Sequence, residues 1–225
     1  MKGIGGRILR LNLTDGSRDV HPTEESLVRL YLGGRGLNVK RLRDLLAPGT
    51  GPDSPDNLLL FGAGPLSGTA FPGGARFNIS GLSPQTGILG DSNAGGYFGP
   101  EMKFAGYDQV VISGRSARPV YLRIDDEKIE LRDARGLSGL DVWETTSAIQ
   151  VAAIGPGAEN GVRFAGVFVN LVRAAARTGM GAVMAAKNLK AVAVRGTRLI
   201  PPADPIRLGE LVAILFERIR NHPEF

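Results

Sequence analysis

The sequence predicts an α+β fold made of two similar halves, each with a largely antiparallel β-sheet and short helices. Strand and helix segments follow one another without the regular β-α-β alternation that builds parallel sheets. Two strands, Val120–Ile124 and Lys128–Arg132, flank the turn residues Asp125-Asp126-Glu127, which is typical of a β-hairpin. Two stretches about 82 residues apart also resemble each other, which indicates an internal duplication.

The first half, predicted to cover residues 1–115, begins with a strand. Gly6–Leu13 alternates apolar and polar side chains, as a half-buried strand does. Thr23 can cap a helix that ends at Gly33-Gly34. The remaining elements are apolar runs between turn residues: a helix at Leu37–Leu46, strands at Asn57–Phe61, Arg76–Ser80 and Ile88–Leu89, a helix at Tyr97–Ala105 and a strand at Gln109–Ser113. The many glycines of residues 62–96 predict loops between the short strands.

The second half, predicted to cover residues 116–200, continues after the hairpin. Apolar runs and cap residues predict a helix at Asp141–Gln150 capped by Asp141, strands at Val151–Ile154, Val162–Val169 and Lys190–Val194, and a helix at Gly179–Asn188. Residues 201–225 are predicted to form a linker, marked by Pro201-Pro202, and the start of a following helical domain. Asp204 caps this last helix, which has one apolar face. The helix either folds back on the preceding domain or opens a further one.

Composition excludes several classes of site. The 225 residues are 43% hydrophobic and 22% charged, which is ordinary for a globular protein. Cysteine is absent and there are two histidines, so this chain holds no disulfide, thiolate-held iron–sulfur cluster, cysteine nucleophile or Cys/His zinc site. No apolar run reaches about 18 residues and the N-terminus lacks an apolar signal core, so we expect a cytoplasmic protein without a membrane span.

The net charge of +5 fits an anionic ligand or an acidic partner. It also fits nucleic acid, but no arginine-rich run or interleaved aromatic surface is present, so we expect no nucleic-acid partner.

The internal repeat predicts a pair of anion sites. Four residue pairs carry the repeat: Gly99 and Gly181, Met102 and Met184, Val110 and Val192, Gly114 and Gly196. Each copy reads as a glycine loop, a short helix and a strand, and two helix N-termini related by a pseudo-twofold axis would suit a ligand with two phosphates. Alternatively, the glycines serve only turns, and Arg76 and Arg173 beside them are ordinary surface residues. No dinucleotide fingerprint or Walker loop is present.

A series of ordered motifs gives a more specific indication. They are GRILRLNLT (Gly6–Thr14), YLGGRGLNVKRL (Tyr31–Leu42), GAGPLSGTAFPGGARFN (Gly62–Asn78), NAGGYFGPEMKFAGYD (Asn93–Asp108), IGPGAEN (Ile154–Asn160) and GMGAVMAAKNLKAVAVRG (Gly179–Gly196). Together they resemble the N-terminal domain of the tungsten-dependent aldehyde:ferredoxin oxidoreductases, over nearly the whole chain.

The resemblance implies a cofactor of two pterins around one tungsten, less often molybdenum, with a magnesium ion bridging the two pterin phosphates. It assigns to cofactor binding the residues Arg76, Asn93, Ala94, Gly95, Arg173, Ala174 and Ala176. The main-chain carbonyls of Asn93 and Ala174 would bind the magnesium, which is sensible ligation for a hard cation.

The resemblance also implies an enzyme that oxidises aldehydes to carboxylic acids and passes electrons to ferredoxin. The 4Fe-4S cluster and the catalytic acid or base would lie in later C-terminal domains, so this chain alone would be inactive and its partners would be ferredoxin, the aldehyde and those domains. Whether the protein forms a homodimer is left open, and the sequence identifies no catalytic residue in this chain. The alternative is a standalone domain that binds a phosphorylated ligand or scaffolds a partner without chemistry of its own.

The second loop departs from the family pattern. Two loop glycines are replaced by Ala176 and Thr178, and a Gly-Ser pair by Ala185-Ala186. If such a position needs a positive φ, the replacement costs roughly 1 kcal/mol or more. The first half therefore carries the implied site more securely, and altered cofactor use is an alternative for the second.

Overall fold

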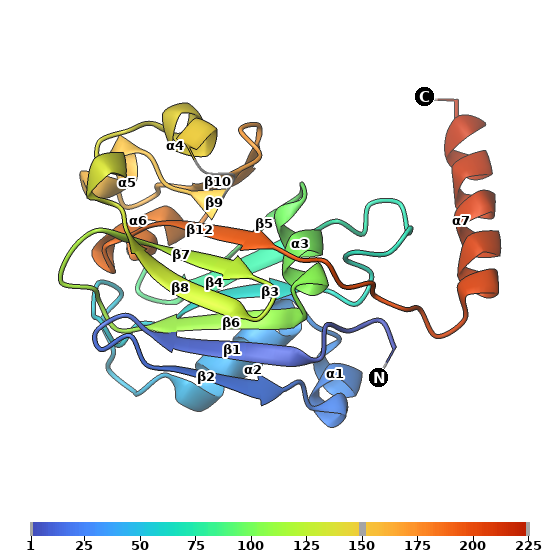
Figure 1. The fold of residues 1–225 in the computed structure, drawn as a ribbon, viewed down its shortest axis with the longest axis horizontal. Helices are drawn as coiled ribbons and strands as arrows, with labels where there is room; N and C mark the ends of the chain where they lie inside the picture. The colour runs from blue at the N-terminus through green and yellow to red at the C-terminus, as the bar shows by residue number, and fades with distance from the viewer. Residues whose placement is uncertain (1, 149–151, 224–225) are drawn as a thin grey trace.

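The computed structural model describes residues 2–148 and 152–223, in which two six-stranded sheets pack around a shared core (Figure 1). The first sheet has the order β2-β1-β6-β3-β4-β5. Its strands are β1 (Arg7–Asn12), β2 (Arg18–Pro22), β3 (Leu59–Ala63), β4 (Phe77–Leu82), β5 (Leu89–Ala94) and β6 (Tyr107–Ser113). The second has the order β8-β7-β12-β9-β10-β11. Its strands are β7 (Val120–Asp125), β8 (Lys128–Asp133), β9 (Ala152–Ala153), β10 (Val167–Val169), β11 (Arg173–Ala175) and β12 (Leu189–Arg195).

The two sheets repeat the same topology strand for strand, which confirms the predicted halves. In each, the first two strands form a hairpin and the first strand pairs in parallel with a strand late in the half, β1 with β6 and β7 with β12. All other neighbours are antiparallel. The parallel pairs share one irregularity, since Asp108 and Lys190, 82 residues apart, are the positions without a partner. The α+β class with largely antiparallel sheets is therefore confirmed.

Short helices connect the strands. They are α1 (Glu25–Tyr31), α2 (Arg35–Leu45), α3 (Phe98–Phe104), the 3-10 turn η1 (Arg135–Leu137), α4 (Val142–Ala148), α5 (Pro156–Glu159), α6 (Met180–Ala186) and α7 (Pro205–Arg220). The core takes side chains from both sheets, with Leu9, Phe61 and Phe77 from the first and Leu122 and Val192 from the second. Burying such side chains contributes about 1.5–3 kcal/mol each, so the halves stabilise each other as one unit.

The paired glycines serve close packing. A Cβ at Gly99 would lie 3.0 Å from Ser67 Oγ, and one at Gly181 would lie 2.8 Å from the carbonyl oxygen of Ala165. The Gly181 amide donates to that same Ala165 oxygen at 2.9 Å. The N-terminus of α6 was expected to present free N–H groups to an anion; this is wrong at Gly181, because the protein itself uses that donor.

Several predicted boundaries change. The expected strand Val162–Val169 is reduced to β10, because turn hydrogen bonds from Val162 to Gly157 and from Ala165 to Val162 precede it. Thr23 does not cap α1; its hydroxyl donates to Asp108 Oδ2 instead. Asp141 does cap α4, since its Oδ1 accepts the Glu144 amide at 2.8 Å. The predicted end of that helix, 149–150, and Val151 of the predicted strand lie outside the described residues.

The last helix, α7, stands apart from the two sheets (Figure 1) and buries none of its residues. Asp204 caps it as predicted, accepting the Arg207 amide at 2.8 Å. Its apolar face, including Ile206 and Ile214, is exposed, so the folded-back arrangement is not observed. Within residues 2–148 and 152–223, no helix has both the length and the apolarity needed to cross a bilayer.

Candidate functional site

A pocket of about 370 Å³ lies where the edge strands β5 and β11 of the two sheets meet. Its lining consists of Gly73, Ala75, Arg76, Asn93, Ala94, Gly95, Gly96, Val172, Arg173 and Ala174. Six of the seven cofactor residues predicted from the sequence are thus brought together from both halves. The seventh, Ala176, follows the end of β11 and does not line the pocket.

The first half supplies its part of the lining from strands. Asn93 and Ala94 end β5 and do not form the loop that the sequence suggests. The Asn93 side chain is held within the sheet, where its Oδ1 accepts from Asn78 Nδ2 at 3.2 Å. Asn78 is itself fixed by a buried hydrogen bond of 2.9 Å from Asn38 Nδ2. Asn93 is itself exposed, so its side-chain nitrogen, the main chain and Arg76, which directly precedes β4, are left to meet a ligand.

The second half supplies its part from a tight hairpin. Asn170 and Leu171, between β10 and β11, both adopt left-handed backbone with φ of 49° and 63°. This turn reverses the chain so that Ala174 pairs with Phe168, and it places Arg173 at the pocket. Arg173 and Ala174 form part of β11, although the sequence predicted a loop there.

The charge of the pocket is positive. Its lining contains two arginines and no acidic residue. Arg76 and Arg173 are exposed, and no carboxylate of the described residues forms an ion pair with either. Guanidinium groups form paired hydrogen bonds with phosphate oxygens. Because the other lining residues are mostly Gly and Ala, an anion can also approach the backbone closely.

A metal ion here would need main-chain ligands. In the part of the chain that the structure describes, no three His, Cys, Asp or Glu side chains gather where they could hold a metal. Hard cations such as magnesium accept carbonyl and phosphate oxygens as ligands. The lining takes Asn93 and Ala94 from β5 and Arg173 and Ala174 from β11, and the main-chain carbonyl is the oxygen ligand that these residues share. This chemistry fits a cation that also binds phosphate oxygens.

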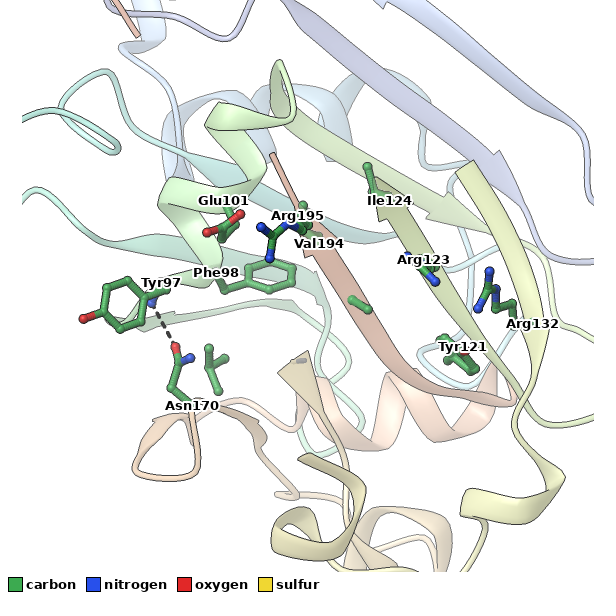
Figure 2. Close-up of a pocket in the computed structure, with 12 residues that line it drawn as sticks. Tyr97, Phe98, Glu101, Tyr121, Arg123, Ile124, Arg132, Asn170, Val194 and Arg195 are labelled. Atoms are coloured by element: carbon green, nitrogen blue, oxygen red, sulfur yellow. Dashed lines mark hydrogen bonds between the residues drawn. The ribbon is translucent and has the colours of Figure 1, made fainter. Parts of the chain in front are cut away.

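A larger pocket of about 500 Å³ lies beside α3 and over β7 and β12 (Figure 2). Two of its arginines are balanced by acids: Arg123 lies 2.9 Å from Asp125, and Arg132 lies 2.7 Å from Glu130. Hydrogen bonds to Tyr121 and Glu130 raise the pKa of Arg132. No sequence pattern pointed to this pocket, because its lining comes from separate elements.

Backbone strain in the second loop falls on one of the two replaced glycines. Thr178 has a φ of 62°, whereas Ala176 is not in the left-handed region. The strain expected from the sequence therefore concerns Thr178 alone. Gly96 and Val172 also line the pocket, although the sequence predicted neither as a site residue. The neighbouring Gly95-Gly96 pair is the sequence feature that could have indicated Gly96.

Comparison with known proteins identifies the family. Residues 8–196 match the family model described as aldehyde ferredoxin oxidoreductase, N-terminal domain. The chain is 44% identical to a tungsten-containing aldehyde ferredoxin oxidoreductase of Pyrococcus furiosus, over 99% of this chain and 38% of the relative. An aliphatic sulfonate oxidoreductase, WOR-like subunit, of the same organism is 34% identical over 89% of this chain and 36% of its own.

A solved structure agrees with this result. The active-site complex BamBC of benzoyl coenzyme A reductase, in complex with 1,5-dienoyl-CoA, is 39% identical with a TM-score of 0.92. The match covers 99% of this chain and 35% of the chain in that structure. This chain thus spans little more than a third of the length of the relatives that it matches. It belongs to the aldehyde ferredoxin oxidoreductase family, of which it matches the N-terminal domain.

Proposed function

We propose that this domain holds the phosphate ends of a bis-pterin tungsten cofactor in an oxidoreductase that converts aldehydes to carboxylic acids. The observation that carries the proposal is that β5 and β11, equivalent strands of two duplicated halves, line one pocket. Its lining also holds Arg76 and Arg173, for which the described residues supply no carboxylate partner. A ligand with two phosphates suits a site with two equivalent walls. The names of relatives 43–44% identical to this chain support tungsten as the metal over molybdenum.

Each wall has the same proposed task. Arg76 would donate hydrogen bonds to one phosphate and Arg173 to the other. The main-chain carbonyls of Asn93 and Ala174 would bind a magnesium ion between the phosphates. Ala94 and Gly95 would admit the ligand to the backbone, since their side chains fill little of the pocket. Ala176, outside the lining, has no part in this proposal.

The division of labour follows from the composition. When bound, the cofactor supplies the two-electron step, in which aldehyde and water give carboxylic acid, two protons and two electrons. We propose that the electrons leave through an iron–sulfur cluster to ferredoxin. This chain contains no cysteine to hold such a cluster. Its residues therefore bind and orient, while the redox chemistry belongs to the cofactor.

The test is the metal content of the Arg76→Ala/Arg173→Ala double variant, purified as the whole product of its gene. We expect tungsten and magnesium to fall at least about tenfold, since each lost phosphate contact costs about 1.5–3 kcal/mol. The far-ultraviolet circular dichroism spectrum should stay unchanged, because both side chains are exposed, and the thermal midpoint should equal that of metal-free wild type, since a ligand that binds the folded state stabilises it. Arg43→Ala, an exposed arginine on α2, is the matched control and should retain both metals.

Wild-type metal content in the double variant would contradict the assignment of the arginines. A wild-type protein that carries no tungsten would contradict the proposed cofactor. That second result would favour a domain that binds another phosphorylated ligand, or one that scaffolds a partner.

A further inference from the structure

We infer that Asn170 is a positioning residue for the proposed cofactor site, because its side chain fastens β11 to the first half and so fixes the separation between Asn93 and Ala174. The inference rests on the proposed function. Strand pairing does not perform this task, since Asn93 and Ala174 belong to different sheets and, among the described residues, no pairing joins β5 to β11.

The fastening is a hydrogen bond between the two halves. Asn170 Oδ1 accepts from the backbone amide of Tyr97 at 2.9 Å, across 73 residues of sequence. Figure 2 shows this bond as a dashed line between the Asn170 side chain and the backbone beside Tyr97 at the start of α3. Tyr97 directly follows Gly95 and Gly96, which line the pocket. Asn170 therefore holds the first-half wall at the point where it leaves the pocket.

Gly96 provides the space for this contact. Its φ is 93°, and a Cβ at this position would lie 2.5 Å from Asn170 Oδ1 and 3.6 Å from Arg173 Cγ. The second-half hairpin thus lies directly on the bare Cα of a first-half glycine. The same contact brings the stem of Arg173 against the first half, so the two walls share one surface.

A second bond holds the other end of β11. The Arg177 amide donates to Ser92 Oγ on β5 at 3.3 Å. Ala174 lies between the two fastened residues, Asn170 and Arg177. The Asn170 bond is the shorter, so we expect it to dominate the spacing between the walls.

The residue type suits the task. Asn170 adopts a φ of 49°, a region that asparagine occupies more readily than most other residues with a side chain. Its amide is neutral, so it joins the walls without placing a negative charge beside an anion site. Magnesium requires near-ideal octahedral geometry at about 2.0–2.1 Å, so two protein carbonyls can serve one ion only when their separation is set closely.

The experiment compares Asn170→Gly with Leu171→Gly in the whole gene product. Both variants replace a left-handed residue of the same turn by glycine, but only the first removes the hydrogen bond to Tyr97. Three quantities are measured: the half-time of magnesium release into EDTA, hydrogen–deuterium exchange of the peptide that contains Tyr97, and the thermal midpoint.

We expect Asn170→Gly to release magnesium about tenfold faster and to exchange the Tyr97 amide faster, with an unchanged thermal midpoint. Leu171→Gly should behave as wild type in all three. Wild-type release from Asn170→Gly would overturn the inference, and so would equal acceleration in both variants, since the turn and not the side chain would then matter. If Arg76→Ala/Arg173→Ala loses the metals while Asn170→Gly keeps them, the inference fails and the proposed function stands. If the wild-type protein holds no magnesium, both fail.

Discussion

Asp108→Asn should be among the most destabilising single changes in this domain. Asp108 is 2% exposed and lies at the unpaired position of β6. Its two carboxylate oxygens accept from the amides of Gly5 and Gly6, from the Thr23 hydroxyl and from Lys103 Nζ, at 2.6–2.8 Å. The carboxylate thus joins the N-terminal segment and the start of α1 to β6 and α3. All four donors depend on one side chain.

The magnitude follows from what asparagine cannot replace. Its single oxygen accepts fewer of the four donors, and its neutral amide leaves the fully buried Lys103 without a counter-charge. Lys103 keeps only the carbonyl oxygen of Gly3, at 3.1 Å. Removing one partner of a buried ion pair costs about 3–5 kcal/mol. We expect the variant to lose this much of its free energy of unfolding, a large part of the roughly 5–15 kcal/mol typical of a domain.

The loss should depend on pH. Burial lowers the pKa of Lys103, and attraction to Asp108 partly opposes that effect. Without Asp108 the pKa of folded Lys103 falls further, while the unfolded lysine keeps a pKa near about 10.4. Between these two values the unfolded state binds more protons than the folded state, so stability rises with pH. The deficit of Asp108→Asn should therefore shrink as the pH rises from 7 towards 10.

The assay is urea-induced unfolding followed by circular dichroism, at pH 7 and at pH 9.5. The control is Lys103→Met/Asp108→Asn, which removes the stranded charge and should recover part of the loss. A deficit below about 1 kcal/mol at pH 7 would refute the reasoning. So would a deficit that stays the same at both pH values.

Two further changes test other parts of the chain. Lys187 is 1% exposed and donates to the carbonyls of Pro55 and Gly114, and burial lowers its pKa to about 8. Below pH 8 the buried charged form lowers the free energy of unfolding by on the order of 3 kcal/mol, and this loss disappears as the pH rises to about 10.5. Urea unfolding across this pH range should therefore show the stability of wild type rising with pH. The profile of Lys187→Met should be flatter. Thr178→Gly removes the backbone strain of a β-branched residue in the left-handed region. After the entropy cost of glycine, the variant should be more stable by about 0.5 kcal/mol and show a higher thermal midpoint. A lower midpoint would contradict the assigned strain.

The sequence predicted the duplication well because the repeated segments carry strong patterns. The 82-residue spacing relates α3 to α6 and β6 to β12 with identical offsets at both ends of each element. The strands that it missed are edge strands without such a pattern. All residues of β2 are exposed, and its RDVHP sequence has no apolar alternation. The RAA of β11 has low strand propensity and is a strand because it pairs with β10.

For the candidate site, the family resemblance named Arg76, Asn93 and Arg173 from short segments with a distinctive glycine or alanine pattern. The structure brings these residues to one pocket, and their role in binding stays a prediction. Asn170 was not located, since its proposed role depends on a contact with Tyr97, which is distant in sequence. A single asparagine in a turn carries no signal of such a contact. Long-range hydrogen bonds of this kind require coordinates.

The two halves share one topology but differ in charge at an equivalent buried position. Asp108 and Lys190 occupy the same unpaired position in β6 and β12, and both are buried, yet their charges are opposite. Asp108 binds the N-terminal segment, whereas Lys190 pairs with Glu159 at 3.0 Å. At the pocket, both halves contribute an arginine, but from places that are not equivalent: Arg76 precedes β4, whereas Arg173 begins β11. The two arginines therefore do not follow from the repeat itself, and an anion held between the halves would explain why each half places one at the same pocket.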